Sequence, residues 1–231
     1  MIEIRRSDER GYADHGWLKS RHSFSFADYQ DPRFVNFGPL RVINEDWIGP
    51  GQGFGMHGHR DMEIITYVLE GAISHRDSLG NAAVIRPGYV QRMSAGTGVR
   101  HSEHNHESIE THMLQIWIIP ARPGGAPSYQ DAAFDRAAQR GAFQLVASAH
   151  GDGGAVTLGQ DARLWAGCFD REEQAQLEIQ SGRRIYAHLA RGECELNGIA
   201  LGAGDAAMMT DQVRLSVRDG RDAELLIFDL P

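Results

Sequence analysis

Short apolar runs separated by turn residues dominate the pattern of hydrophobic and polar positions along this chain. The run 63–69 is rich in β-branched and aromatic residues, which favour strands. The run 113–119 is almost continuously apolar, as in a central strand that is buried on both faces. Shorter strands are predicted at 1–5 and 40–44, the second ended by Asp46. Because no long helical period is present, the pattern predicts a β-sandwich or a β-barrel.

One further strand is predicted around the alternating residues His22, Phe24 and Phe26, which are separated by two serines. The period of two predicts an edge strand with an aromatic face on the core. His22 could reach a functional site from there. We nevertheless expect a core residue, because a lone histidine on an apolar face is usually a satisfied core side chain.

The second half of the chain repeats the pattern of the first. Hairpin turns are predicted at Gly80-Asn81 and at Asn197-Gly198, and the apolar run 225–231 parallels 114–120. This internal duplication predicts two similar domains. The proline- and glycine-rich stretch 123–127 reads as a linker, followed at 131–140 by a short helix or an irregular arm. We therefore expect an all-β protein with one domain over residues 1–134 and another over 135–231.

Composition narrows the class of protein. The chain has 231 residues, 42% of them hydrophobic and 23% charged, which is typical of a soluble globular protein. A formal charge of −8 argues against direct contact with nucleic acid. No apolar run approaches the roughly 20 residues of a membrane span, and the N-terminus does not resemble a signal peptide. We expect a cytoplasmic protein with two free cysteines, and a monomer, because no extra apolar strand needs a partner.

Two histidine motifs are the candidate chemistry. His57 and His59 are two residues apart, and so are His101 and Glu103, so each pair lies on one face of its strand. Three imidazoles and one carboxylate aimed at one point form a mononuclear metal site. Such a set suits Fe(II), Mn(II), Ni(II), Cu(II) or Zn(II), and the spacing does not choose among them. On an octahedral ion, two positions would stay open for water, dioxygen or substrate.

The second half of the chain has no such motif. His57 and His59 lie fourteen and twelve residues before Gly71. At the same distances before Gly192, the chain has Glu178 and Gln180. The sequence therefore predicts one half with a metal site and one structural half.

These motifs resemble those of a known superfamily. Gly51, His57, His59, Glu63 and Gly71 are similar to the first cupin motif, and Gly98, His101 and Asn105 to the end of the second. The run Gly16-Trp-Leu-x3-His22-Ser-Phe-Ser-Phe26 and the run Met93–Glu103 resemble signatures of the pirin family. Pirins are bicupins whose second barrel is degenerate, so the resemblance implies two tandem jelly-roll barrels.

The resemblance also implies a ligand set and an activity. The metal would be held by His57, His59, His101 and Glu103, with iron as the usual assignment. Glu63 occupies the place of the general cupin glutamate, but in pirins the carboxylate follows the third histidine, so we assign Glu63 an indirect supporting role. Bacterial pirins are associated with quercetin 2,3-dioxygenation, in which a flavonol and dioxygen react and carbon monoxide is lost. Glu103 would accept the flavonol proton as a general base.

Two alternatives remain open at this stage. Some pirins act as transcription cofactors, so the chain could instead be a redox- or metal-sensing protein that binds a protein partner. A metal-assisted isomerase or hydrolase is a third possibility, because cupins host many reactions. His75 and Asp77, also at strand spacing, could line the pocket. We expect them in an exposed hairpin, because residues near turns are mostly solvated.

Overall fold

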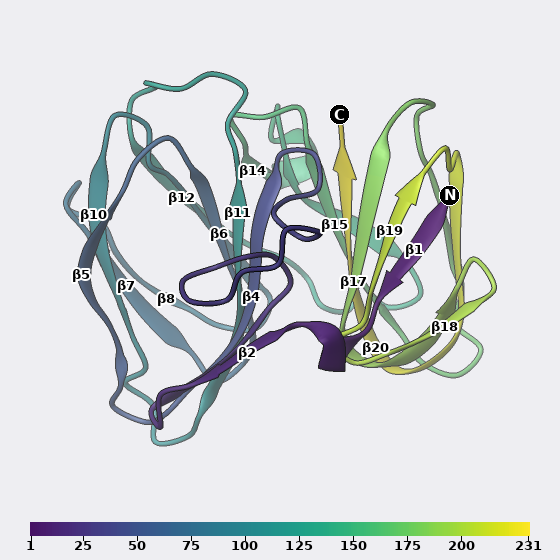
Figure 1. Ribbon diagram of the computed structural model, residues 1–231, viewed down its shortest axis with the longest axis horizontal. Helices are drawn as coiled ribbons and strands as arrows, with labels where there is room; N and C mark the ends of the chain where they lie inside the picture. Colours follow the sequence, from purple (N-terminus) through teal and green to yellow (C-terminus); the bar gives the residue numbers. More distant parts are fainter. The chain divides into compact units, whose positions relative to one another are not determined.

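The computed structural model describes residues 1–231, which divide into two compact units (Figure 1). The N-terminal unit comprises Gly11–Ala133 and Val156–Gln160. The C-terminal unit comprises Met1–Arg10, Phe134–Ala155 and Asp161–Pro231.

Two antiparallel sheets form the N-terminal unit. The larger has the strand order β12-β9-β6-β11-β4-β3-β2, and the smaller has the order β5-β10-β7-β8. The strands of the larger sheet, in that order, are Ser128–Ala133, Tyr89–Ser94, Glu63–Glu70, Thr111–Ile118, Leu40–Ile48, Leu18–His22 and Gly11–Asp14. Those of the smaller sheet are Gly53–His59, Val99–His104, Ile73–Asp77 and Ala82–Ile85. The two-residue strand β14 (Val156–Thr157) also belongs to this unit.

The C-terminal unit is built on a sheet of order β1-β19-β17-β20-β15-β13, with β16 paired to β20 and β18 paired to β17. In the order just given, these strands are Ile2–Arg5, Ala206–Thr210, Arg184–Leu196, Arg214–Leu230, Arg163–Phe169, Phe143–Ser148, Ala175–Glu178 and Ile199–Gly202. Two single-turn 3₁₀ helices, η1 (Ser7–Glu9) and η2 (Asp152–Gly154), are its helical segments.

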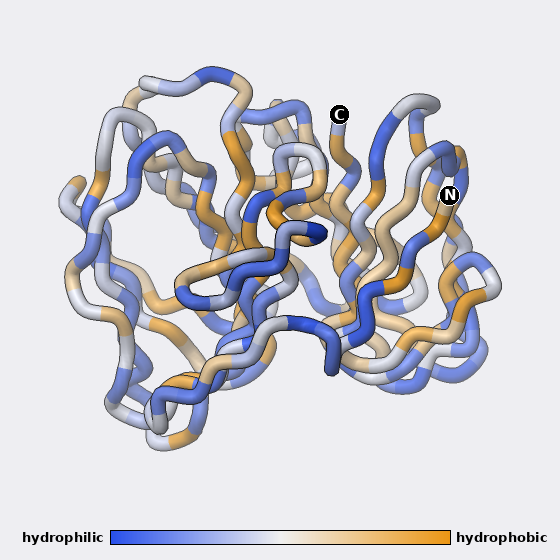
Figure 2. The backbone as a smooth tube through the Cα atoms, in the orientation of Figure 1, coloured by the Kyte–Doolittle hydropathy of each residue, from blue (hydrophilic) through white to orange (hydrophobic).

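Apolar clusters hold each unit together. In the N-terminal unit, Val68 of β6 and Met113 of β11 pack with Ile73 of β7 and Ile85 of β8, so the cluster joins both sheets. All four side chains are at most 1% exposed, and each such burial contributes about 1.5–3 kcal/mol. The C-terminal unit has a larger cluster over β17, β19 and β20. In Figure 2, apolar stretches follow strands and strongly polar ones lie at many turns.

The predicted all-β class and several elements are confirmed. Strand β11 lies between β6 and β4, as expected for the run 113–119. Asn197-Gly198 forms the tight turn between β17 and β18, where Leu196 pairs with Ile199. The turn containing Gly80 joins β7 to β8.

Other element predictions are wrong in instructive ways. Strand β4 does not stop near Asn44 but runs to Ile48, because Glu45 and Asp46 have buried polar partners instead of ending the strand in solvent. The predicted strand around Phe24 ends at His22; a bend follows at 23–24, and Phe26 forms only an isolated bridge with Tyr29. Of the two alternatives for residues 131–140, the helix is wrong and the irregular arm is observed: β12 ends at Ala133 and turns follow.

The compact units divide the chain between Ala133 and Phe134, close to the expected position, but two segments cross over. Residues 1–10 belong to the C-terminal unit because β1 pairs with β19, Ile2 opposite Met209. Residues 156–160 belong to the N-terminal unit, where Thr157 donates its backbone N–H to Gln130 Oε1 at 3.0 Å.

Candidate metal centre

Strands β5 and β10 bring the three predicted histidines together. In their antiparallel pairing His101 lies opposite His57, and Val99 lies opposite His59. The ring of His101 is 4.4 Å from that of His57 and 4.9 Å from that of His59, centroid to centroid. One nitrogen from each ring lies within 4.8 Å of the others. This grouping matches what a single ion with three imidazole ligands requires.

The tautomer of His57 is set by its own strand. Its Nδ1 lies 2.8 Å from the carbonyl oxygen of Gly55, so Nδ1–H donates there and the lone pair is on Nε2. His59 packs edge-on against Trp117 at 4.9 Å. Burial, and then the neighbouring His57, lower the pKa of His59 to about 4. His59 is therefore neutral at pH 7 and can act as a ligand.

His101 carries the clearest indication of a cation site. It is 1% exposed, and neither ring nitrogen has a hydrogen-bond partner in the protein. Burial, and then the neighbouring rings of His57 and His59, lower its pKa to about 2, so the ring is neutral. A buried polar group without a partner costs about 1–3 kcal/mol, and a metal ion relieves that cost. These residues therefore fit a divalent transition metal.

Glu103 lies beside the three histidines but in a second group. One of its carboxylate oxygens lies within 4.8 Å of nitrogens of His75 and His101, whereas it is not grouped with His57 and His59. Its Oε1 accepts from Thr66 Oγ1 at 3.0 Å, and its Oε2 accepts from Gln115 Nε2 at 2.9 Å. Burial raises the pKa of Glu103 to about 7, against these two hydrogen bonds. A bound cation would lower it again.

The expectation that His75 and Asp77 are exposed is wrong. They are 1% and 9% exposed, because β7 pairs with β10 and places them opposite Glu103 and His101. His75 Nε2 lies 3.2 Å from Asp77 Oδ2, and its ring stacks on Tyr129 at 5.0 Å. The prediction relied on the closeness of both residues to a turn in sequence. It failed because the hairpin of β7 and β8 places these side chains in the interior, against β10.

Glu63 stands apart from both histidine groups. It is 4% exposed at the start of β6, and its Oε2 accepts a hydrogen bond from Ser94 Oγ at 2.7 Å.

A cavity of about 750 Å³ opens onto the metal-site histidines and Glu103. Aromatic rings form part of its lining, and His22 is among the lining residues, 5% exposed and 2.8 Å from Asn44 Oδ1 through its Nδ1. We had expected His22 to lie in the apolar core. It lies at the cavity instead. The aromatic lining consists of Tyr12, Trp17, Phe26, Tyr29, Phe54 and Trp117.

Four polar residues of this cavity were missed at the level of sequence. Ser20, Asn44, Asp46 and Gln115 all line it, and each is at most 8% exposed. A signal did exist: polar residues at every second position inside apolar strands face one side of a sheet. In β3 and β4, that rule selects Ser20 and His22, and Asn44 and Asp46.

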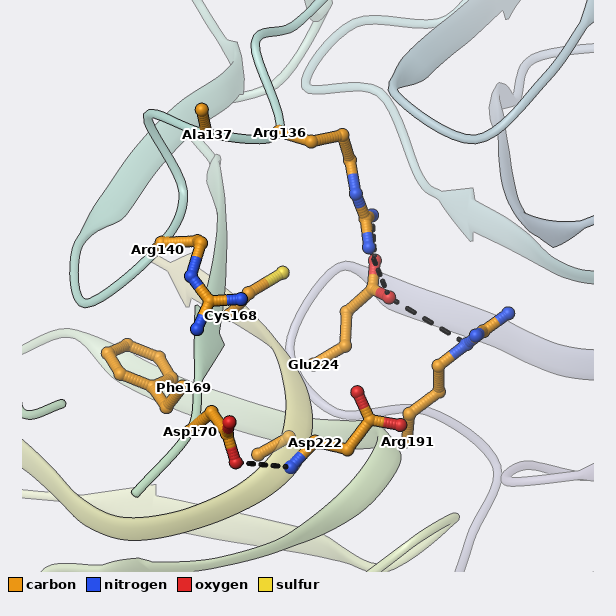
Figure 3. A pocket seen from close by; sticks show the side chains of 10 residues that line it. Arg136, Ala137, Arg140, Cys168, Phe169, Asp170, Arg191, Asp222 and Glu224 are labelled. Atoms are coloured by element: carbon orange, nitrogen blue, oxygen red, sulfur yellow. Dashed lines mark hydrogen bonds and ion pairs between the residues drawn. The ribbon is translucent and has the colours of Figure 1, made fainter. Parts of the chain in front are cut away.

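The C-terminal unit has a hollow of about 370 Å³ (Figure 3). Arg136 binds the buried carboxylate of Glu224 through two hydrogen bonds, 2.6 and 3.0 Å long, and Arg191 lies 3.8 Å from it. Three arginines and three acidic residues line this hollow, so its charges balance. Both potential metal-binding groups lie in the N-terminal unit, and Glu178 pairs with Arg214 at 2.7 Å instead.

Fold and site together define a cupin-type protein with two β-barrel domains and a histidine-rich centre in one of them. The pirin family model matches residues 3–118, and the model of the quercetinase C-terminal cupin domain matches residues 145–230. The chain belongs to the pirin family. The expected family and fold are thereby confirmed.

Full-length relatives agree with this assignment. Quercetin 2,3-dioxygenase of Escherichia coli K12 is 44% identical over 232 residues, covering 100% of this chain and 99% of the relative. A pirin-like protein of Caulobacter vibrioides is 44% identical over 230 residues, covering 99% of each. The crystal structure of the E. coli pirin YhhW in complex with nickel(II) superimposes with a TM-score of 0.94 at 44% identity, covering 100% and 99%. The expected relationship to oxidoreductases of the quercetin 2,3-dioxygenase type is confirmed.

No helix of the chain is both long and apolar enough to cross a membrane.

Proposed function

We propose that this protein is a metal-dependent dioxygenase that opens the heterocycle of flavonols with dioxygen and releases carbon monoxide. The observation that carries the proposal is the position of His57, His59 and His101 together on an aromatic-lined cavity. His101, buried and without hydrogen-bond partners, has no evident structural role that a leucine could not fill. The names of the full-length relatives point to the same substrate class.

The ion would be held by His57, His59 and His101 through nitrogen and by Glu103 through oxygen. We assign Fe(II), while the same donors also accept Ni(II), Zn(II), Mn(II) and Cu(II). A related pirin binds nickel(II). When bound, such an ion supplies Lewis-acid activation of the substrate oxygens and a position for dioxygen.

The chain itself would bind and orient the substrate. A flavonol is a flat, hydroxylated set of rings, and the cavity of about 750 Å³ is large enough for one. Trp117, which packs on His59, and Phe54, 6.5 Å from His57, offer aromatic contact next to the histidines. Stacking on such rings contributes about 0.5–1.5 kcal/mol per pair beyond simple burial. Asn44 and Gln115 present hydrogen-bonding groups for the substrate's hydroxyls.

The proposal is tested by mixing iron-loaded protein with quercetin and measuring oxygen uptake and carbon monoxide release in equal amounts. We expect His57→Ala to lose activity by at least about 100-fold, the scale on which loss of an electrostatic catalytic group acts. His106→Ala is the matched control, because His106 is exposed and outside both histidine groups. If His57→Ala and wild type turn over equally, the activity does not come from this centre.

A further inference from the structure

A second buried carboxyl group lines the same cavity as the histidines. Asp46 lies in β4, directly opposite Ser20 of β3, and is 4% exposed. The hydroxyl of Ser20 donates a hydrogen bond to Asp46 Oδ1. The other oxygen, Oδ2, accepts no hydrogen bond from the protein, yet it is not among the enclosed polar atoms that lack a partner. Oδ2 is therefore the oxygen that the cavity can reach.

The two carboxylates, Glu103 and Asp46, differ in how many of their oxygens are free of hydrogen bonds. Both oxygens of Glu103 already accept hydrogen bonds, from Thr66 and Gln115, and coordination would occupy a further lone pair. Asp46 keeps a whole oxygen for the cavity, and it belongs to neither potential metal-binding group. A carboxylate bound to a cation is a weak base, so the free one is the better proton acceptor.

From this difference, and resting on the function proposed above, we infer that Asp46 is the catalytic base that takes the proton from the flavonol hydroxyl. In this step the substrate O–H bond breaks and its electron pair stays on the substrate oxygen. A new O–H bond forms at Asp46 Oδ2. The flavonolate and dioxygen then give a carboxylate product and carbon monoxide, with the charge unchanged. Asp46 finally returns its proton to solvent, so the cycle consumes no other reactant. The role replaces the one that the sequence suggested for Glu103.

The surroundings of Asp46 suit this role at neutral pH. Burial raises its pKa to about 7, the Ser20 hydrogen bond opposes the rise, and the neighbouring Glu45 adds to it. Titratable groups from several elements line the same cavity. They are Tyr12, His15, His22, Asp28, Tyr29, His57, His59, His101 and Glu103. A general base works best when its pKa lies near the working pH.

Asp46→Asn tests the inference, because asparagine keeps the size of the side chain and can still accept from Ser20. Quercetin is added to nickel-loaded protein without oxygen, and the absorption band of the flavonolate is followed from pH 5 to 9. We expect this band to appear about 100-fold more slowly after mixing in the variant, because no carboxylate remains at this position to accept the proton. With iron and oxygen, kcat should fall by about 100-fold or more, the usual contribution of a general base. Asp14→Asn is the control: the same chemical change, exposed and outside the cavity.

Ser20→Ala gives an independent test that does not remove the base. Loss of the hydroxyl should raise the pKa of Asp46, so the acidic limb of the kcat profile moves to higher pH. An unmoved limb in Ser20→Ala, or a wild-type rate of flavonolate formation and a wild-type kcat in Asp46→Asn, would overturn the role of Asp46 alone. A wild-type protein that neither ionises nor oxidises quercetin would overturn the proposed function, and the role of Asp46 with it.

Discussion

Replacement of His101 by leucine should stabilise the metal-free protein while abolishing its stabilisation by metal. The side chain is 1% exposed, and both ring nitrogens are buried without partners. Each unsatisfied buried polar atom costs about 1–3 kcal/mol, and an apolar side chain of similar size removes that cost. Imperfect packing of leucine against His57 and His59 offsets part of the gain, typically by about 1 kcal/mol. Because two nitrogens are relieved, we therefore expect a net gain of about 1–5 kcal/mol.

Metal should stabilise the wild-type protein and leave the variant unchanged. An ion that binds only the folded state at about 100 times its dissociation constant stabilises by about 2.7 kcal/mol. For a chain of this size, about 1 kcal/mol corresponds to about 2–4 °C in melting temperature. Wild type should therefore melt about 5–10 °C higher with nickel(II) than with a chelator, whereas the His101→Leu variant should melt at the same temperature in both.

Differential scanning calorimetry of both proteins, each with nickel(II) and with chelator, measures all four values. His106→Leu serves as the control, because it places the same side chain at an exposed position outside the site. The reasoning fails if His101→Leu destabilises the chelated protein by more than about 1 kcal/mol, since the nitrogens would then have been satisfied. It also fails if nickel(II) raises the melting temperature of the variant as much as that of wild type.

Three further predictions follow from backbone contacts, ion pairs and titration. Gly53→Ala should weaken nickel(II) binding by about tenfold or more in calorimetric titration, because the new Cβ would lie 2.2 Å from the carbonyl oxygen of Glu103 and force β5 away from β10. Gly55→Ala is the control: its Cβ would have no atom within 4 Å, so the variant should bind nickel(II) within about twofold of wild type. Arg136→Ala should lower the free energy of unfolding measured in urea by about 3 kcal/mol, because the buried carboxylate of Glu224 loses its main partner. Arg221 forms an exposed pair with Glu193, so Arg221→Ala should change this free energy by less than about 1 kcal/mol. Burial raises the pKa of Asp46 from 3.8 to about 7, so between these pH values the folded state binds a proton that the unfolded state has lost. The free energy of unfolding must therefore fall as pH rises from about 4 to about 7. Asp46→Asn should flatten this decline in urea titrations, and an equal slope in both proteins would contradict the prediction.

The sequence predicted strands well where burial was the only demand on a segment. The runs that became β6 and β11 are β-branched or continuously apolar, and packing alone places them in the sheet interior. It also predicted that His57, His59 and His101 come together, because a spacing of two is a direct geometric statement about a strand. Both successes rest on local periodicity, which needs no knowledge of the partner strands.

The failures occurred where a residue's environment is set by a partner far away in sequence. Asp46 was read as the end of a strand, because the hydroxyl that satisfies it belongs to Ser20, on another strand. His75 was placed in solvent, because only its pairing across from Glu103 shows that the hairpin faces inward. Buried polar residues are thus the part of a site that periodicity alone assigns wrongly, since their burial depends on hydrogen bonds that sequence does not display.

The same dependence explains why the chemistry is confined to one unit, although both have similar strands. A buried ligand set is stable only if its neutral imidazoles and its carboxylate are all held by neighbours, as Gly55 holds His57 and Thr66 holds Glu103. In the C-terminal unit, the equivalent Glu178 is exposed and its charge is matched by Arg214, so the position contributes to surface pairing instead. Restoring two histidines there would not restore a site, because the second strand would still lack a histidine and a satisfied carboxylate opposite them.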